Sequence, residues 1–353
     1  MFRIVLLFMS CLSVFWINGQ SVPINRVRVL ASHNSYKCLP EKGVIRFLHR
    51  LQFLLPDGLN PDEMDYGHIP IEEQLDSFNI RGLELDVYAD PAGGLFSKRR
   101  LPFFIWGPKQ NSERHELTLP GIKILHIKDV DYQSNVNTWV EAMQRLSKWS
   151  DSHVGHSVVF VNVEIKNESP GGSSRWLRYL GFRPAEPFDK KALIELTNVA
   201  IKEMGEHLYT PKEMMGDYFN LKERVVQKGW PTMEDTKGKF IFILEGLAED
   251  LKSEVLSNEL DYPFFYYGNE ENPNVVFVLK NNCKGNEAEI QECVQSGLMV
   301  RTRADAGTYE SRKNDWNTYY SAVKSGAQII STDYYLPDRR WSEYCVPSLI
   351  SND

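Results

Sequence analysis

The sequence predicts an α/β fold, a (β/α)8 TIM barrel that forms a single domain. Eight short apolar runs rich in Val, Ile or Phe recur along the chain, and helical patterns lie between several of them. Polar residues collect at the carboxyl ends of these runs, which is where barrel enzymes place their chemistry. No Pro- or Ser-rich linker divides the chain. A doubly wound open sheet remains the alternative architecture.

The predicted elements follow from hydrophobic periodicity. We expect strands at residues 27–31, 81–88, 123–127, 158–165, 239–245, 274–280, 298–303 and 327–333. Helices are expected at residues 44–55, 135–149, 189–204 and 312–324, with Asp189 capping the third.

Polar side chains stand at or just past the carboxyl ends of most predicted strands. They are His33 and Asn34, Glu84 and Asp86, His126, Glu164, Glu245, Lys280, Arg301 and Arg303, and Asp333. In a barrel these ends meet at one rim, so residues far apart in the sequence should lie together there.

The strand at residues 81–88 is the most informative, because two carboxylates interrupt its apolar run. Glu84 and Asp86 are two residues apart and therefore point to the same face, while Leu83, Leu85 and Val87 fill the other face. Two carboxylates pressed together repel each other and lose hydration, so the pair requires a cation or a shared proton.

Composition limits the classes of function. The chain has 353 residues and a net charge of −7, which argues against a nucleic-acid partner. Residues 1–20 have the pattern of a secretory signal peptide, with Arg3 followed by an apolar run, and an uncleaved anchor is the rival interpretation. We therefore expect a secreted monomer whose catalytic barrel spans residues 21–353.

Four cysteines remain outside the predicted signal peptide, and an even number in an oxidising compartment indicates two disulfides. A zinc site is disfavoured, because no pair has CxxC-type spacing. Three pairings exist. The first and last strands of a closed barrel are neighbours, which predicts Cys38–Cys345, and Cys283–Cys293 would then close a loop within one connection.

The rim also predicts a metal site. Asn34, Glu84, Asp86 and Glu164 offer only oxygen ligands, which suits a hard cation, Ca²⁺ before Mg²⁺. The alternative is that each acid forms an ion pair with a basic residue such as Lys128, Lys166 or Arg301.

Histidines and basic residues complete the predicted rim. His33 and His126 could form an acid/base pair that works near neutral pH, although a histidine at a strand end is often structural. Lys280, Arg301 and Arg303 add positive charge that suits a phosphate group, or they pair with acids. Together a cation, two histidines and basic residues indicate phosphodiester cleavage.

Four sequence motifs carry a family resemblance. They are Ser32-His-Asn-Ser-Tyr36, Gly82-Leu-Glu-Leu-Asp86, Ile124-Leu-His126 and Phe160-Val-Asn-Val-Glu164. In this order they resemble the catalytic half-barrel of phosphatidylinositol-specific phospholipases C, and most closely the secreted, calcium-dependent, single-domain branch. The later stretches at residues 300–305 and 327–335 look like the same branch, so the resemblance covers nearly the whole chain after residue 20.

The resemblance implies roles for the matching residues. His33 and His126 would be the catalytic histidines, and Asn34, Glu84, Asp86 and Glu164 the calcium ligands. Apart from the resemblance, we expect Lys280, Arg301, Arg303 and Tyr334 to bind the substrate. The implied reaction is attack by the inositol 2-hydroxyl on phosphorus, which releases diacylglycerol and a cyclic inositol phosphate. His126 would protonate the leaving oxygen, and His33 would bind the phosphoryl group or act as base, a role for which Glu164 is the alternative.

A phospholipid substrate implies contact with a membrane surface. The helix at residues 44–55 and the aromatic run at residues 103–106 are the two candidate contacts, unless both pack on the barrel wall.

Two rival functions remain. The nearest rival is a glycerophosphodiester phosphodiesterase. The first motif of that family has a His-Arg pair, whereas this chain has His33-Asn34 at the corresponding place. The other rival is a secreted lipid- or glycan-binding protein whose barrel has lost its catalytic activity. Such a loss would remove a histidine or a metal ligand from the motifs, and all of them are present.

Overall fold

The computed structural model describes residues 22–55, 60–106, 114–257 and 262–348. The predicted signal peptide lies outside the described residues. Within the described ranges, no helix is both long and apolar enough to cross a membrane.

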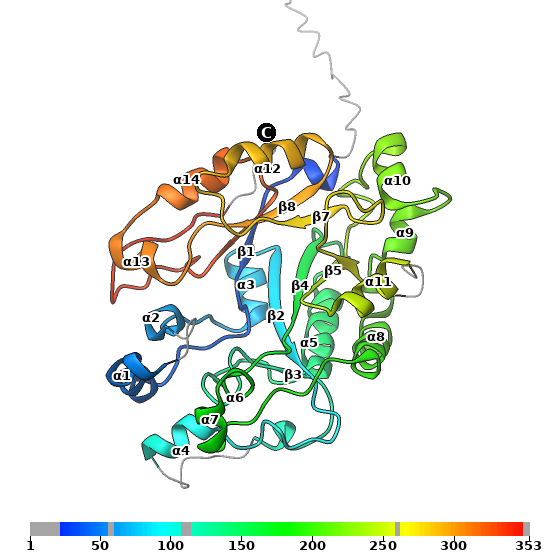
Figure 1. Ribbon diagram of the computed structural model, residues 1–353. Coiled ribbons are helices and arrows are strands. Elements are labelled where there is room, and N and C mark those ends of the chain that lie inside the picture. The colour runs from blue at the N-terminus through cyan, green and yellow to red at the C-terminus, as the bar shows by residue number, and fades with distance from the viewer. Residues whose placement is uncertain (1–21, 56–59, 107–113, 258–261, 349–353) are drawn as a thin grey trace, which may run out of the picture.

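Eight parallel strands form a nearly closed barrel, which confirms the predicted fold class (Figure 1). Their spatial order is β6-β5-β4-β2-β1-β9-β8-β7. The strands are β1 (Val29–Ser32), β2 (Gly82–Tyr88), β4 (Val159–Ile165), β5 (Phe240–Glu245), β6 (Phe265–Tyr266), β7 (Phe277–Leu279), β8 (Met299–Arg303) and β9 (Ile329–Thr332).

Barrel closure places the two ends of the chain side by side. β1 pairs with β9 along its whole length, from Val29 beside Ile329 to Ser32 beside Thr332. The weak point is between β6 and β7, where a single parallel bridge joins Tyr267 to Phe277.

The predicted third strand is wrong as a member of the barrel. β3 contains only Lys123–Ile124, runs antiparallel to β2 and lies beside it off the main strand order. The chain then turns instead of extending: Asp129 has a φ of 67° and Ile127 pairs with Asp131. His126 therefore lies on a turn and not at the end of a barrel strand.

The strand that replaces it was not predicted. β6 is only two residues long and begins two residues after Pro263, and two residues are too few to show any period. Because β3 is off the main order, β2 and β4 are direct neighbours.

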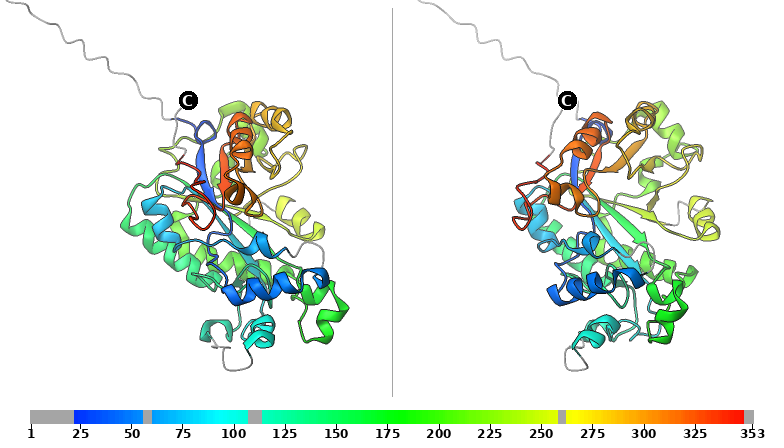
Figure 2. Two further views of the ribbon diagram at one scale, coloured as in Figure 1. Left: turned by 90° about the vertical axis from the view of Figure 1, so that its left-hand side faces the viewer. Right: turned by 60° about the vertical axis from the view of Figure 1, so that its left-hand side comes forward.

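Helices cover the outside of the barrel, and α5 packs against α8 there (Figures 1 and 2). The α-helices are α1 (Lys42–Arg50), α2 (Pro61–Met64), α3 (Ile71–Ser77), α4 (Arg100–Trp106), α5 (Trp139–Ser152), α6 (Pro170–Ser173), α7 (Arg175–Tyr179), α8 (Lys190–Met204), α9 (Pro211–Met215), α10 (Leu221–Lys228), α11 (Glu249–Ser257), α12 (Glu287–Gln295), α13 (Tyr309–Lys313) and α14 (Asn317–Lys324).

Two of the helix predictions can be compared in detail. Asp189 caps α8 as predicted, since its carboxylate accepts a hydrogen bond from the Ala192 N–H. The single helix expected at residues 312–324 is wrong, because α13 and α14 are separate. Asn314 ends α13 with a left-handed φ of 51°, a conformation that Asn tolerates better than most residues.

The two faces of each strand explain the position of the polar residues. On β2, Leu83, Leu85 and Val87 are buried in the layer between the sheet and the helices, so Glu84 and Asp86 face the barrel interior. Lower in the barrel, inward positions are apolar, as Phe160 on β4 and Ile329 on β9 show. The interior thus changes from apolar to charged toward the carboxyl ends of the strands.

The helix proposed for membrane contact has one buried face. Val44, Ile45 and Leu48 of α1 are buried against Leu101 of α4 and Phe182. Part of the aromatic run is exposed nevertheless, since Phe103 and Phe104 have 38% and 43% of their surface accessible.

The four cysteines are free thiols in this structure, so neither predicted disulfide is formed. The Cys283 thiol donates to the carbonyl oxygens of Arg303 and Thr318, both at 3.4 Å. The Cys345 thiol donates to the Tyr335 carbonyl at 3.2 Å. The two pairings stay predictions.

Candidate active site

Three carboxylates, two of them buried and the third half-buried, meet at the centre of the rim. Asp86 on β2 lies in register with Glu164 on β4, and Glu84 stands one step deeper on β2. One ligand atom from each lies within 4.8 Å of the others. Three carboxylates so close require positive charge, and an all-oxygen set of this kind is suited to calcium.

Asn34 adds an amide to this cluster. It follows β1 with a left-handed φ of 49°, which turns its side chain toward Asp86. With its nitrogen toward Asp86 it donates to Oδ1 at 2.9 Å, and its oxygen accepts from the Tyr66 hydroxyl at 2.8 Å. Turned the other way, it donates to Tyr66 and directs its oxygen at the carboxylate, an arrangement that a shared cation would stabilise.

Two basic side chains hold the acids in this structure. Arg301 of β8 reaches across the barrel interior to Glu84, and Lys166 lies 3.2 Å from Asp86 and 2.5 Å from Glu164. Lys128, the third predicted partner, pairs with Asp129 instead.

The pKa values show that this compensation is incomplete. Burial, together with Glu164 and Glu84, raises the pKa of Asp86 well above its ordinary value despite Lys166. Burial also raises the pKa of Glu245, the next acid along the rim, to about 7. The cluster therefore fits an additional cation.

His33 is fixed by side chains from three elements. Its Nδ1 lies 2.8 Å from Asp333 Oδ1 and 3.1 Å from the Tyr66 hydroxyl. Arg303 donates to its Nε2 at 3.2 Å, which defines Nε2 as the unprotonated nitrogen of a neutral ring. Arg303 also pairs with Asp333 at 3.0 Å, so histidine, aspartate and arginine form a closed triangle.

His126 is held by one aspartate. Its Nδ1 lies 3.0 Å from Asp131 Oδ2, and the Lys37 amine, fully buried, lies 3.3 Å from the same oxygen. The Tyr88 hydroxyl donates to the His126 carbonyl at 3.2 Å and ties the turn to β2. No described residue forms a hydrogen bond with Nε2 of His126, which remains available to a ligand.

Electrostatics keep both imidazoles neutral at rest. Burial and then Arg303 lower the pKa of His33 well below its ordinary value. Burial also lowers the pKa of His126, although Asp131 opposes the shift. The pKa of Asp131 itself is lowered, since Lys37 and His126 outweigh the effect of burial. The aspartate thus stays ionised beside a histidine that can accept a proton.

A comparison with protein families shows which family this chain belongs to. The sequence model described as "Phosphoinositide phospholipase C, Ca2+-dependent" matches residues 22–350. The chain belongs to this family. The family is calcium-dependent, and its members are phosphoric diester hydrolases. Among curated protein sequences, none matches this chain.

Solved structures show the same fold at low sequence identity. The calcium-dependent phosphoinositol-specific phospholipase C from Pseudomonas sp. is 13% identical, with a TM-score of 0.54 over 88% of this chain and 90% of that chain. A second structure of the Pseudomonas sp. enzyme is a myo-inositol complex, with 13% identity, a TM-score of 0.54, and coverage of 89% and 91%. The calcium-dependent phosphatidylinositol-specific phospholipase C from Streptomyces antibioticus is 14% identical, with a TM-score of 0.53 over 89% of this chain and 96% of that chain.

The structure brings together most of the site residues that were predicted from the sequence, but not all of them. Lys280 lies away from the central acids, with its amine 2.7 Å from Glu270 and 2.6 Å from Glu289. Tyr334 is buried and packs edge-on against Tyr344. As placed, neither side chain faces the acidic cluster.

Three residues that support this site were not predicted from the sequence, and a fourth was predicted without its contact. Asp131 and Lys37 stand beside predicted residues, but nothing in the sequence distinguishes them from ordinary loop residues. Asp333 was predicted as a rim residue from its place at the end of an apolar strand, but that position carries no signal for its bond to His33. Tyr66 lies in the connection after α2, and only the fold shows that it reaches His33.

Proposed function

We propose that this chain cleaves phosphatidylinositol-type lipids to diacylglycerol and a cyclic inositol phosphate. The supporting observation is that two histidines, each held at Nδ1 by an aspartate, lie at the same rim as a cluster of three carboxylates and two arginines. Family membership supports the reaction class, and the myo-inositol bound by the Pseudomonas enzyme supports the head group.

Asn34, Glu84, Asp86 and Glu164 would hold Ca²⁺. When bound, the ion would lower the pKa of the inositol 2-hydroxyl and offset negative charge on the phosphoryl oxygens. Lys166 now lies between Asp86 and Glu164, so it would have to move aside for both carboxylates to become ligands.

The protein's own groups would move the protons. The 2-hydroxyl oxygen bonds to phosphorus as the bond to the glycerol oxygen breaks. Its proton passes to a base at the rim, for which His33 and Glu164 are the two candidates. His126, protonated at Nε2, donates to the leaving oxygen. Asp131 stabilises that protonated form, and the phosphodiester anion beside Nε2 favours it further.

Arg303 and Arg301 would position the phosphoryl group. Arg303 contacts His33 directly, so a phosphate that binds this guanidinium lies next to the imidazole. In this proposal the enzyme is secreted as a monomer and meets its substrate at a phospholipid surface.

The deciding experiment is product analysis with phosphatidylinositol vesicles. We expect cyclic inositol phosphate, detected by ³¹P NMR, with calcium present and none with a chelator. Glycerol phosphate as the product would instead identify a glycerophosphodiester phosphodiesterase. Full turnover in chelator would refute the metal assignment.

Asp86→Asn tests the ligand set without destroying the fold. The amide cannot supply the missing charge, so activity should fall steeply and calcium titration should no longer restore it. The melting temperature should hold, because an uncharged isostere avoids the burial and the repulsion from Glu164 and Glu84 that raise the pKa of Asp86. Asp217→Asn on the exposed turn after α9 is the matched control and should behave as wild type.

A further inference from the structure

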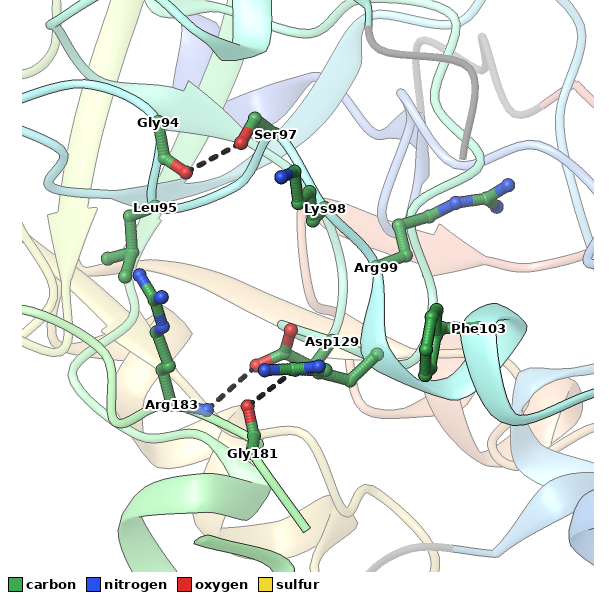
Figure 3. A pocket seen from close by; sticks show the side chains of 10 residues that line it. Gly94, Leu95, Ser97, Lys98, Arg99, Phe103, Asp129, Gly181 and Arg183 are labelled. Carbon is green, nitrogen blue, oxygen red and sulfur yellow. Dashed lines mark hydrogen bonds between the residues drawn. The ribbon is translucent and has the colours of Figure 1, made fainter. Parts of the chain in front are cut away.

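A basic cavity lies outside the acidic cluster, between the insert that joins β2 to β3 and the later residues Asp129, Gly181 and Arg183. Its volume is about 690 Å³, within the range of small-ligand sites. Its charged lining is Lys98, Arg99, Arg100, Arg183 and Asp129, with Phe103 at one side. Figure 3 shows Arg183 across the cavity from Arg99 and Phe103.

Some charged side chains of this basic cavity have partners of opposite charge, and others do not. Its one acid, Asp129, is bound by Lys128 at 2.6 Å and by the Arg183 N–H at 3.1 Å. Arg99 pairs with Glu41 at 3.3 Å. The side chains of Lys98 and Arg183 are exposed, and no acid within the described ranges forms an ion pair with either. The cavity therefore presents excess positive charge.

Arg100 is built into the wall. Its Nε donates to the Gly181 carbonyl at 2.8 Å. A Cβ at Gly181 would come within 2.6 Å of Arg100 Nη2, and Gly181 has a φ of +86°, so only glycine suits this position. The close approach holds the guanidinium against residues 181–183.

The cavity borders the turn that carries His126 and an aromatic surface. Asp129 belongs to that turn, and its carbonyl accepts a hydrogen bond from the Leu101 N–H at 3.0 Å. Exposed aromatic side chains stand on the adjoining helices: Phe103 and Phe104 on α4, and Trp176 and Tyr179 on α7. Figures 1 and 2 show α4 and α7 at the same end of the molecule, opposite α10.

We propose that this cavity binds a phosphomonoester anion at a site separate from the acidic cluster. Guanidinium groups match the geometry of phosphate oxygens, and unpaired cations favour a doubly charged group over the singly charged phosphodiester of the substrate. The anion is either a lipid head group, with the aromatic side chains in the interface, or a soluble phosphate.

The test compares two double variants of the full chain in chelator, so that no turnover occurs. Lys98→Gln with Arg183→Gln removes two cations from the cavity and keeps a polar side chain at each position. Lys212→Gln with Lys228→Gln removes two exposed cations from α9 and α10 and is the matched control. The probes are phosphatidylcholine vesicles with and without phosphatidic acid, measured by sedimentation, and inorganic phosphate, measured by calorimetry.

For a lipid ligand, the cavity variant should bind phosphatidic acid vesicles about 30-fold more weakly, while the control binds as wild type. For a soluble ligand, inorganic phosphate should bind wild type and control, and the cavity variant should lose this binding. Equal losses in both variants, or no loss in the cavity variant, would overturn the proposal. Because only binding is measured, these outcomes are independent of the proposed phospholipase C reaction.

Discussion

The two histidines of the rim have similar supports on one side of the ring and different surroundings on the other. Each Nδ1 is held by an aspartate, Asp333 for His33 and Asp131 for His126. On the opposite nitrogen, His33 accepts a hydrogen bond from Arg303, whereas no described residue forms one with Nε2 of His126. The contacts at Nε2 therefore distinguish two otherwise similar groups.

This difference follows from their places in the fold. His33 directly follows β1. Its partner Asp333 directly follows the adjacent β9, and its partner Arg303 is the last residue of β8, so three parts of the sheet fix it. His126 stands on a turn after the short antiparallel β3. An arginine beside His33 favours a neutral ring next to a phosphate, while the free nitrogen of His126 can exchange a proton. The geometry thus favours His126 as the general acid.

The strongest test of this comparison is a leaving-group experiment with His126→Gln and His33→Gln. Loss of the acid should slow cleavage of the lipid roughly 10²- to 10⁴-fold. A nitrophenyl phosphodiester of inositol needs no proton on its leaving group. Its rate of cleavage should therefore stay near the wild-type value in His126→Gln but fall in His33→Gln.

The side chains of both histidines are less than one-fifth exposed, at 17% and 18%, so melting curves must accompany the kinetics. If the nitrophenyl substrate rescues His33→Gln instead, the two roles are reversed. If it rescues neither variant, His126 is not the proton donor.

A second, smaller effect is expected from Asp131→Asn. A lost hydrogen bond to a charged group should lower kcat roughly 10- to 150-fold. Asp131 raises the pKa of His126, whereas burial, Lys37 and Lys166 lower it. Without the carboxylate the imidazolium loses its proton at lower pH, so the alkaline limb of the kcat profile should move to lower pH.

Asp333→Asn is the matched comparison, since its carboxylate bonds to His33 and not to His126. It should shift the alkaline limb less than Asp131→Asn. An equal or larger shift would assign that limb to His33.

The acidic cluster could be predicted from the sequence because it obeys local rules. Glu84 and Asp86 stand two residues apart in an apolar strand, and that spacing alone places them on one face. The structure confirms the barrel and brings Glu164 beside Asp86. The period of two in a strand shows which side chains share a face, but only for residues close together in the sequence.

The supports of the histidines could not be predicted in the same way. Asp131 reaches His126 because Asp129 adopts a left-handed φ and reverses the chain, and the prediction of a continuous strand there was wrong. Asp333 reaches His33 through pairing of strands 300 residues apart in the chain. Such contacts depend on tertiary packing, which a strand pattern does not contain.

The smallest predicted effect concerns the Tyr66 hydroxyl, whose hydrogen-bond partners among the described residues are on the His33 side. Its hydroxyl lies 3.1 Å from His33 Nδ1 and 2.8 Å from the Asn34 amide, and its ring stacks on His33. Tyr66→Phe keeps the ring and removes one neutral hydrogen-bonding group, worth about 1 kcal/mol, so kcat/KM should fall about fivefold. Because Asn34 is a proposed calcium ligand, the calcium concentration for half-maximal activity should rise as well.

Tyr320→Phe on α14 is the control, since that tyrosine is 61% exposed and should give wild-type values. The alkaline limb should not move in Tyr66→Phe, because Asp131 still supports His126. A shift of that limb without any change in calcium dependence would contradict the separation of the two histidines, and it would show that Tyr66 acts on the proton donor.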